Sequence, residues 1–105
     1  MRERREITEL VDQITRRFKP EKVILFGSHA YGRPKKDSDI DLMVIMNTRK
    51  NTLDAAAEVR CAVQHSFPID IIVRTPKQIE RRLKWGDSFI REVTEKGRVL
   101  YEAPG

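Results

Sequence analysis

The sequence contains only one cysteine, Cys61, and two histidines in 105 residues. A single cysteine excludes an intrachain disulfide and fits a reducing cytoplasm, which is where we expect the protein to work. No Cys/His cluster of the kind that binds zinc is present. We expect Cys61 to be a buried or half-buried structural thiol, not a reactive one.

Long hydrophobic runs are also missing. No apolar stretch approaches the roughly 20 residues of a membrane span, and the N-terminal segment MRERREITEL lacks the apolar region of a signal peptide. We therefore expect no membrane association. A length of 105 residues predicts a single domain, residues 1–105, with one modest core and no second substrate-binding domain.

The chain is basic, with a net charge of +5 and a pI near 9.7. Such a balance favours polyanions, including nucleic acid or a nucleoside triphosphate. Acids and bases are interleaved along most of the chain, however, so charge is weak support for nucleic-acid binding. The bases gather at Arg33–Lys36 and at Arg74–Arg98, and we expect the second group to form solvated helix faces.

Hydrophobic periodicity predicts a small α/β (α+β) domain with helices around a sheet. Helices are expected over residues 3–18, 52–65, 75–86 and 87–97. Strands are expected at Val23–Phe26, Asp39–Met46 and Ile69–Val73, with a short extended segment at Val99–Tyr101.

Capping residues support these helix boundaries. Thr52 is the expected N-cap of the second helix, and Thr75-Pro76-Lys77-Gln78 has the form of a capping box with proline at the first helical position. Trp85 precedes Gly86, where the third helix ends. We expect Trp85 to pack the last two helices onto the sheet, although its basic surroundings also allow it to stack on a base.

Two aspartates alternate with apolar residues in the second strand. Asp39 and Asp41 share one face of this strand, because successive side chains point to opposite faces. Residues i and i+2 lie about 6–7 Å apart, a separation at which two carboxylates can bind one metal ion or two adjacent ions. Hard oxygen ligands select magnesium or manganese.

Asp70 lies between two isoleucines in the third strand. A carboxylate in such a strand is costly to bury unless a cation or hydrogen-bond donors hold it. If the third strand lies beside the second, Asp70 completes a three-carboxylate site. A structural salt bridge to one of the many Arg or Lys side chains is the alternative, and the sequence leaves both open.

Gly27 and Ser28 follow the first strand directly. A glycine at this place lets backbone N–H groups approach an anion closely, and the serine hydroxyl adds a donor. A Gly-Ser pair alone is also compatible with a simple turn. His29 comes next and could contact phosphate, but we expect it to face solvent.

The combination of these motifs resembles a known signature. Phe26-Gly27-Ser28 followed by Ser38-Asp39-Ile40-Asp41-Leu42 is similar to that of the DNA polymerase beta-type nucleotidyltransferase superfamily. The size of the chain and the C-terminal pattern, Phe89-Ile90-Arg91-Glu92-Val93 followed by Gly97-Arg98-Val99-Leu100-Tyr101, resemble its smallest branch, the minimal nucleotidyltransferases. The resemblance spans about residues 5–101.

The resemblance implies a small mixed β-sheet flanked by helices and a site that uses ATP. Asp39 and Asp41 would bind two Mg²⁺ ions, or Mn²⁺, Asp70 would supply the third carboxylate, and Gly27 and Ser28 would hold the triphosphate. Relatives are commonly encoded with a small helical HEPN-type toxin, which the nucleotidyltransferase antitoxin can modify by transferring AMP to a tyrosine. A hetero-oligomer or homo-oligomer is therefore expected.

The chain departs from the superfamily pattern at one position. Tyr31 stands where many relatives carry arginine, so Arg33, Lys36 or a neighbour would have to contact the triphosphate. Three hypotheses follow: an enzyme that modifies a protein hydroxyl, an antitoxin that neutralises a HEPN ribonuclease by binding alone, and, least favoured, a basic nucleic-acid-binding protein. In the first two, the acceptor or target must be another molecule.

Overall fold

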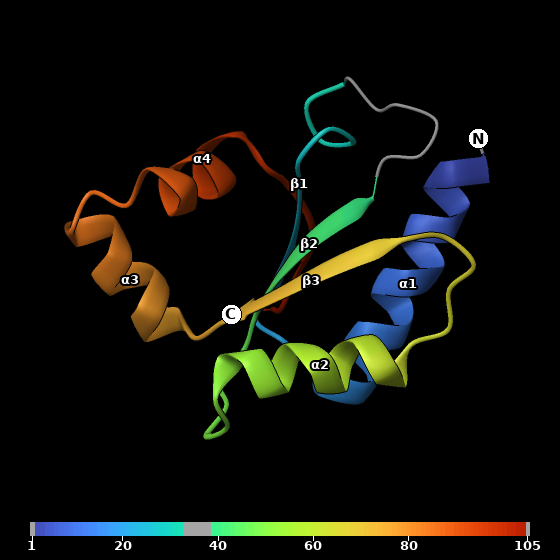
Figure 1. Cartoon of the computed structure of the whole chain (residues 1–105), viewed down its shortest axis with the longest axis horizontal. Coiled ribbons are helices and arrows are strands. Elements are labelled where there is room, and N and C mark those ends of the chain that lie inside the picture. The colour runs from blue at the N-terminus through green and yellow to red at the C-terminus, as the bar shows by residue number, and fades with distance from the viewer. Residues whose placement is uncertain (1, 33–38, 105) are drawn as a thin grey trace.

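The protein consists of a four-stranded sheet with helices on both faces. The computed structural model describes residues 2–32 and 39–104, and Figure 1 shows the order of elements within them. The helices are α1 (Arg2–Phe18), α2 (Thr52–Ala62), α3 (Pro76–Lys84) and α4 (Ser88–Lys96). The strands are β1 (Lys22–Phe26), β2 (Ile40–Ile45), β3 (Ile69–Arg74) and β4 (Arg98–Glu102).

The sheet is mixed, with strand order β3-β2-β1-β4. β1 is antiparallel to both β2 and β4, whereas β2 and β3 are parallel. A parallel pair needs a long crossover connection, and α2 lies within this one. The parallel register sets Asp41 directly beside Asp70, so two of the three expected carboxylates lie on neighbouring strands.

The larger core lies between the sheet and helices α1 and α2. Alternate residues of β2, Ile40, Leu42 and Val44, point into it, and all three are nearly inaccessible to solvent. The other buried members of this core are Leu10, Val11, Ile14, Val23, Leu25, Ala55, Ala56, Val59, Val63, Ile71 and Val73.

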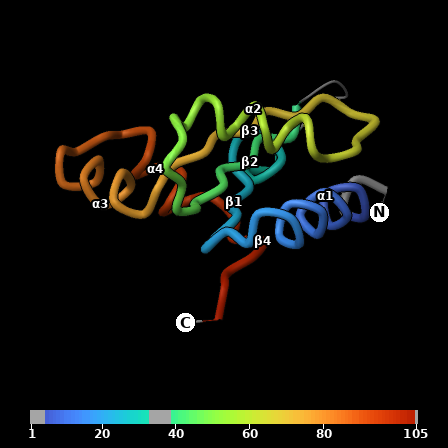
Figure 2. The backbone as a smooth tube through the Cα atoms, turned by 90° about the horizontal axis from the view of Figure 1, so that it is seen from below, coloured from blue at the N-terminus to red at the C-terminus, as the bar shows by residue number. Residues whose placement is uncertain are grey.

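A smaller core lies on the opposite face of the sheet. Met43 and Ile45 of β2 meet Ile90 and Val93 of α4 there, together with Ile24 and Phe26 of β1. Helices α3 and α4 thus lie across the sheet from α1 (Figures 1 and 2). The alternation expected for the second strand is confirmed, and Asp41 belongs to the face of Met43 and Ile45.

The N-terminus of α2 differs from the expectation. Asn51 is the N-cap, because its side-chain oxygen accepts a hydrogen bond of 2.8 Å from the Leu53 N–H, and Thr52 is already the first helical residue. The helix ends at Ala62 instead of near His65, since Val63 has extended backbone angles.

The capping box of α3 is confirmed. The Thr75 hydroxyl accepts a bond from the Gln78 N–H, and the Gln78 side-chain oxygen accepts one from the Thr75 N–H. Replacing Thr75 with alanine should lower the free energy of unfolding by about 1 kcal/mol, as measured by urea titration. Serine at this position should retain most of the stability, and a full loss with serine would contradict the capping role.

Two residues expected from the sequence to be buried, Trp85 and Cys61, are exposed. Trp85 is 68% exposed because α3 has no buried residue, so Trp85 does not pack the last helices onto the sheet. Cys61 is exposed, since it lies two residues after the buried Val59 and therefore points away from the buried side of α2.

Within residues 2–32 and 39–104, no helix has the length and hydropathy needed to span a bilayer.

Candidate active site

The turn after β1 places a glycine against a carboxylate. Gly27 has φ +74°, in the left-handed region that side chains rarely adopt. A Cβ atom at this position would lie 2.1 Å from Oδ2 of Asp41, closer than any real contact. Glycine is thus required here both by the backbone angle and by the Asp41 carboxylate.

A single helical turn follows Gly27. The backbone N–H groups of Ala30 and Tyr31 both donate to the Gly27 carbonyl, at 3.1 Å each. Ser28 and His29 lie within this turn and are half-buried. His29 is thus only partly exposed, and whether it faces solvent or contacts phosphate stays a prediction.

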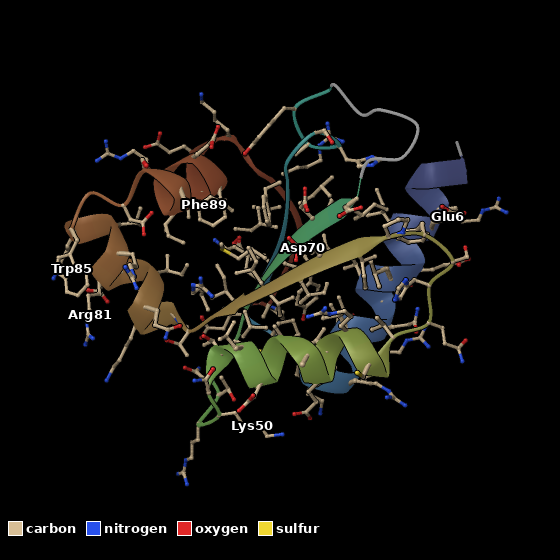
Figure 3. All side chains as sticks on the ribbon, in the orientation of Figure 1. Glu6, Lys50, Asp70, Arg81, Trp85 and Phe89 are labelled. Carbon is tan, nitrogen blue, oxygen red and sulfur yellow. The ribbon has the colours of Figure 1, made fainter. Side chains whose placement is uncertain are left out.

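The three aspartates come together at one end of the parallel strand pair. Asp41 and Asp70 are register partners on β2 and β3, which puts their strands about 4.8 Å apart. Asp39 immediately precedes β2. It is two residues before Asp41 and therefore lies on the same side of the extended chain. Asp39 and Asp70 are exposed and Asp41 is half-buried, and Figure 3 shows Asp70 on β3 where it runs beside β2.

Partial burial and the charges of the neighbouring aspartates disfavour ionisation of Asp41. Partial burial raises the pKa of Asp41 above its ordinary value, the negative charges of Asp70 and Asp39 raise it further, and His29 opposes the rise. The structure shows no salt bridge to Asp70 within its described residues, so the alternative of a structural ion pair finds no support there. A bound cation would relieve the repulsion.

The carboxylates are adjacent but do not converge on one point. In the part of the chain that the structure describes, no three His, Cys, Asp or Glu side chains form a ready metal cluster. To share one cation with Asp41, the exposed side chains of Asp39 and Asp70 would have to adopt other rotamers. Oxygen ligands alone suit Mg²⁺ or Mn²⁺.

Helix α4 borders the site, which the sequence did not indicate. The rings of Phe26 and Phe89 meet edge to face at 5.6 Å, and this contact fixes α4 beside the end of β1. Tyr31 is 38% exposed. Its pKa is raised by partial burial and then by Glu92 of α4, with a smaller contribution from Asp41. Glu92 faces the turn from α4, and no motif marked it beforehand.

Two expected phosphate ligands, Arg33 and Lys36, lie outside the described residues. Two cavities in the described part, of about 500 and 410 Å³, are lined by other residues than the three aspartates. Asp39 and Asp70 themselves are exposed.

A glycine-serine turn beside carboxylates at the end of a strand pair is the arrangement that the resemblance to nucleotidyltransferases predicts. The chain belongs to the nucleotidyltransferase domain family, whose model matches residues 7–101. The resemblance to minimal nucleotidyltransferases is thereby confirmed, and the chain is a nucleotidyltransferase.

Similar proteins agree with this assignment. The chain is 31% identical over 104 residues to a Methanocaldococcus jannaschii protein named putative protein adenylyltransferase, with 96% of this chain and 100% of the relative covered. A putative nucleotidyltransferase from Sulfolobus solfataricus has a similar structure, with a TM-score of 0.66 and 22% identity over 93% of this chain and 78% of that one. A toxin-antitoxin structure with AMP-PNP gives a TM-score of 0.57 and 20% identity over 91% and 73%. The two structures confirm the expected fold, a small mixed sheet flanked by helices of the polymerase beta type.

Proposed function

We propose that this protein transfers AMP from ATP to a hydroxyl group of another protein. The observation that carries the proposal is the pairing of Asp41 with Asp70 across β2 and β3, directly against the Gly27 turn. A carboxylate pair beside an anion-binding turn suits a metal-assisted attack on a nucleotide triphosphate.

Divalent cations fit the residues present. The donors are all carboxylate oxygens, and the raised pKa of Asp41 reflects burial together with negative charge from Asp70 and Asp39. We assign Asp39 and Asp41 to two Mg²⁺ ions, with Asp70 as a further ligand of one. When bound, such ions polarise the α-phosphate, favour deprotonation of the acceptor and neutralise pyrophosphate.

The chain's own residues position the reactants. The backbone at Gly27 and the Ser28 hydroxyl hold the triphosphate, assisted by Arg33 and Lys36. The acceptor oxygen bonds to the α-phosphorus, the bond from that phosphorus to the bridging oxygen breaks, and pyrophosphate leaves with the electron pair. The acceptor's proton passes to a carboxylate oxygen of Asp70, which is exposed on an edge strand.

The acceptor we favour is a tyrosine of a small helical HEPN-type toxin. One relative is named a putative protein adenylyltransferase, and one structural neighbour is a toxin-antitoxin with AMP-PNP. Asp39 and Asp70 are exposed, which leaves both carboxylates within reach of a macromolecular acceptor. The two proteins would then form a hetero-oligomer, at least transiently.

The proposal is tested by incubating the protein with α-labelled ATP, Mg²⁺ and the product of the adjacent gene. We expect the label on the partner, and more than about a 100-fold loss of labelling with Asp39→Asn, since even outer-shell changes cost 10–100-fold at metal sites. Asp12→Asn, on the exposed side of α1, is the matched control and should label normally. Equal labelling by Asp39→Asn would refute the assignment.

An antitoxin that acts by binding alone is the second candidate. It is favoured by Tyr31, because a neutral phenol replaces the arginine of many relatives near the triphosphate. In that case, Asp39→Asn should still protect cells from the toxin. Loss of protection together with loss of labelling would exclude it.

A further inference from the structure

A second polar cavity lies at the far end of β3. Its volume is about 410 Å³, and it lies between the start of α2, the end of β3 and helix α3. Figure 3 shows Arg81 and Trp85 together on this side of the molecule, away from Asp70. The lining residues used below are Leu53, Arg74, Gln78, Arg81, Arg82 and Trp85.

The cavity carries an excess of positive charge. Arg82 lies 3.9 Å from Asp87 and also 5.7 Å from the Trp85 ring. Arg74 and Arg81 have no carboxylate partner within residues 2–32 and 39–104. The Arg74 guanidinium is partly buried and donates to the Val73 carbonyl at 2.8 Å, so it is held in place before any ligand binds. Two guanidinium groups are thus available to an anion.

The same cavity exposes apolar surface. Leu53 is 77% exposed and Trp85 is 68% exposed, whereas large apolar side chains are usually better covered. The Gln78 oxygen is already used in the capping box, which leaves its amide donors for a ligand. Trp and Arg together are the residues that most often dominate the energy of protein–protein interfaces.

A protein ligand fits this surface better than a nucleic acid. Glu80 and Asp87 interrupt the bases along and after α3, so there is no continuous basic path for a phosphate backbone to follow. The exposed side chain of Leu53 lines the cavity and can contact an apolar side chain of the ligand. The chemistry of the cavity matches an acidic peptide segment that also carries an aromatic or aliphatic residue.

The cavity lies at the end of β3 opposite to the carboxylate cluster, between α2 on one side of the sheet and α3 on the other, and Arg74 of β3 lines it. Asp70 and Arg74 are four residues apart on β3, so their side chains share a face and lie about 13 Å apart along the strand. A bound segment could therefore extend from the cavity to the aspartates. This is the distance that four residues of extended chain cover.

We propose that this cavity docks an acidic segment of the protein acceptor while the acceptor hydroxyl reaches the carboxylate cluster. The identity of the ligand as the acceptor rests on the proposed function. Its chemistry, acidic groups beside an apolar anchor, rests on Arg74, Arg81, Trp85 and Leu53 alone.

Trp85 is the single tryptophan of the chain, so its fluorescence reports directly on the cavity. The probe is a synthetic peptide, Glu-Glu-Leu-Tyr-Glu-Glu, compared with the version in which every Glu is Gln. We expect a saturable change in Trp85 emission with the acidic peptide and at least about a tenfold weaker affinity with the neutral one, since the neutral peptide lacks the charge-assisted hydrogen bonds to the arginines.

Arg81→Gln should weaken binding of the acidic peptide by at least about tenfold. Arg60→Gln makes the same change in charge at the other end of α2 and should bind like the wild type. Equal binding by both variants, or no saturable change with the acidic peptide, would overturn the docking proposal. So would a 12-nucleotide oligoadenylate that changes Trp85 emission when the peptide does not.

Asp39→Asn separates this inference from the proposed function. We expect the variant to bind the acidic peptide as the wild type does, because binding does not require the chemistry. If Asp39→Asn retained nucleotidyl transfer, the catalytic assignment would fail and the docking site would stand. If Arg81→Gln labelled the partner at wild-type KM, the docking site would fail and the catalytic assignment would stand.

Discussion

Replacing Asp41 with asparagine is expected to abolish nucleotidyl transfer while making the metal-free protein more stable. The activity loss should exceed about 100-fold, since Asp41 is assigned to both ions and weaker perturbations of metal sites already cost 10–100-fold. The gain in stability follows from its pKa, which partial burial and the charges of Asp70 and Asp39 raise above 3.8 in the folded state.

The sign of this effect follows from proton linkage. A raised pKa means that the folded state binds a proton more tightly than the unfolded state, so ionising Asp41 costs stability. The cost is absent below pH 3.8, grows as the pH rises through the folded-state pKa and is complete above it. Asparagine cannot ionise, so Asp41→Asn should have the higher Tm at pH 7 in EDTA, by on the order of a few degrees.

Thermal unfolding across this pH range provides the measurement. The Tm difference between wild type and Asp41→Asn should shrink as the pH falls toward 3.8. Adding Mg²⁺ should raise the Tm of the wild type and leave that of the variant nearly unchanged, since a ligand that binds only the folded state stabilises it. Asp12→Asn should follow the wild type throughout. A lower Tm for Asp41→Asn at pH 7 in EDTA would show that the carboxylate stabilises the fold.

Replacing Gly27 with alanine should damage both stability and activity. The φ of +74° costs about 1–2 kcal/mol for a residue with a Cβ, and that Cβ would lie 2.1 Å from Oδ2 of Asp41. Asp41 must therefore move or the turn must open. We expect the free energy of unfolding to fall by about 2–4 kcal/mol in total and labelling of the partner to fall by more than about 100-fold.

Gly32 offers a matched control in the same loop. Its φ is +78° and a Cβ there meets no atom of residues 2–32 and 39–104 within 4 Å, so Gly32→Ala should incur the backbone cost without the clash with Asp41. The difference between the two variants, measured by urea titration, isolates the contact with Asp41. If both lost the same stability and activity, the close approach of Asp41 to Gly27 would have no consequence.

Much of the fold could be predicted because local patterns agree with tertiary contacts. The alternation in β2 and the Thr75 capping box depend on neighbouring residues in the chain, and both are found in the structure. The pairing of Asp41 with Asp70 was conditional on β3 lying beside β2, and the parallel register fulfils that condition.

The failures have a common physical cause. Trp85 and Cys61 were expected to be buried because such residues usually are, but burial depends on which helix face meets the sheet. Glu92 comes near the turn because Ile90, Val93 and the Phe26–Phe89 contact hold α4 against the end of β1, and no local pattern encodes those contacts. The sequence likewise did not indicate that β4 pairs with β1.

The layout of the two strand ends has a consequence for how such a protein can diversify. The aspartates and the glycine turn lie at one end of the β2–β3 pair, whereas the arginines and Trp85 lie at the other end and on α3. Substitutions at the exposed positions of α3, away from Ile79, which packs against the smaller core, would leave both cores intact. Preference for a partner could therefore change through substitutions on the exposed surface of α3. The aspartates and the Gly27 turn, at the opposite end of the β2–β3 pair, would stay the same.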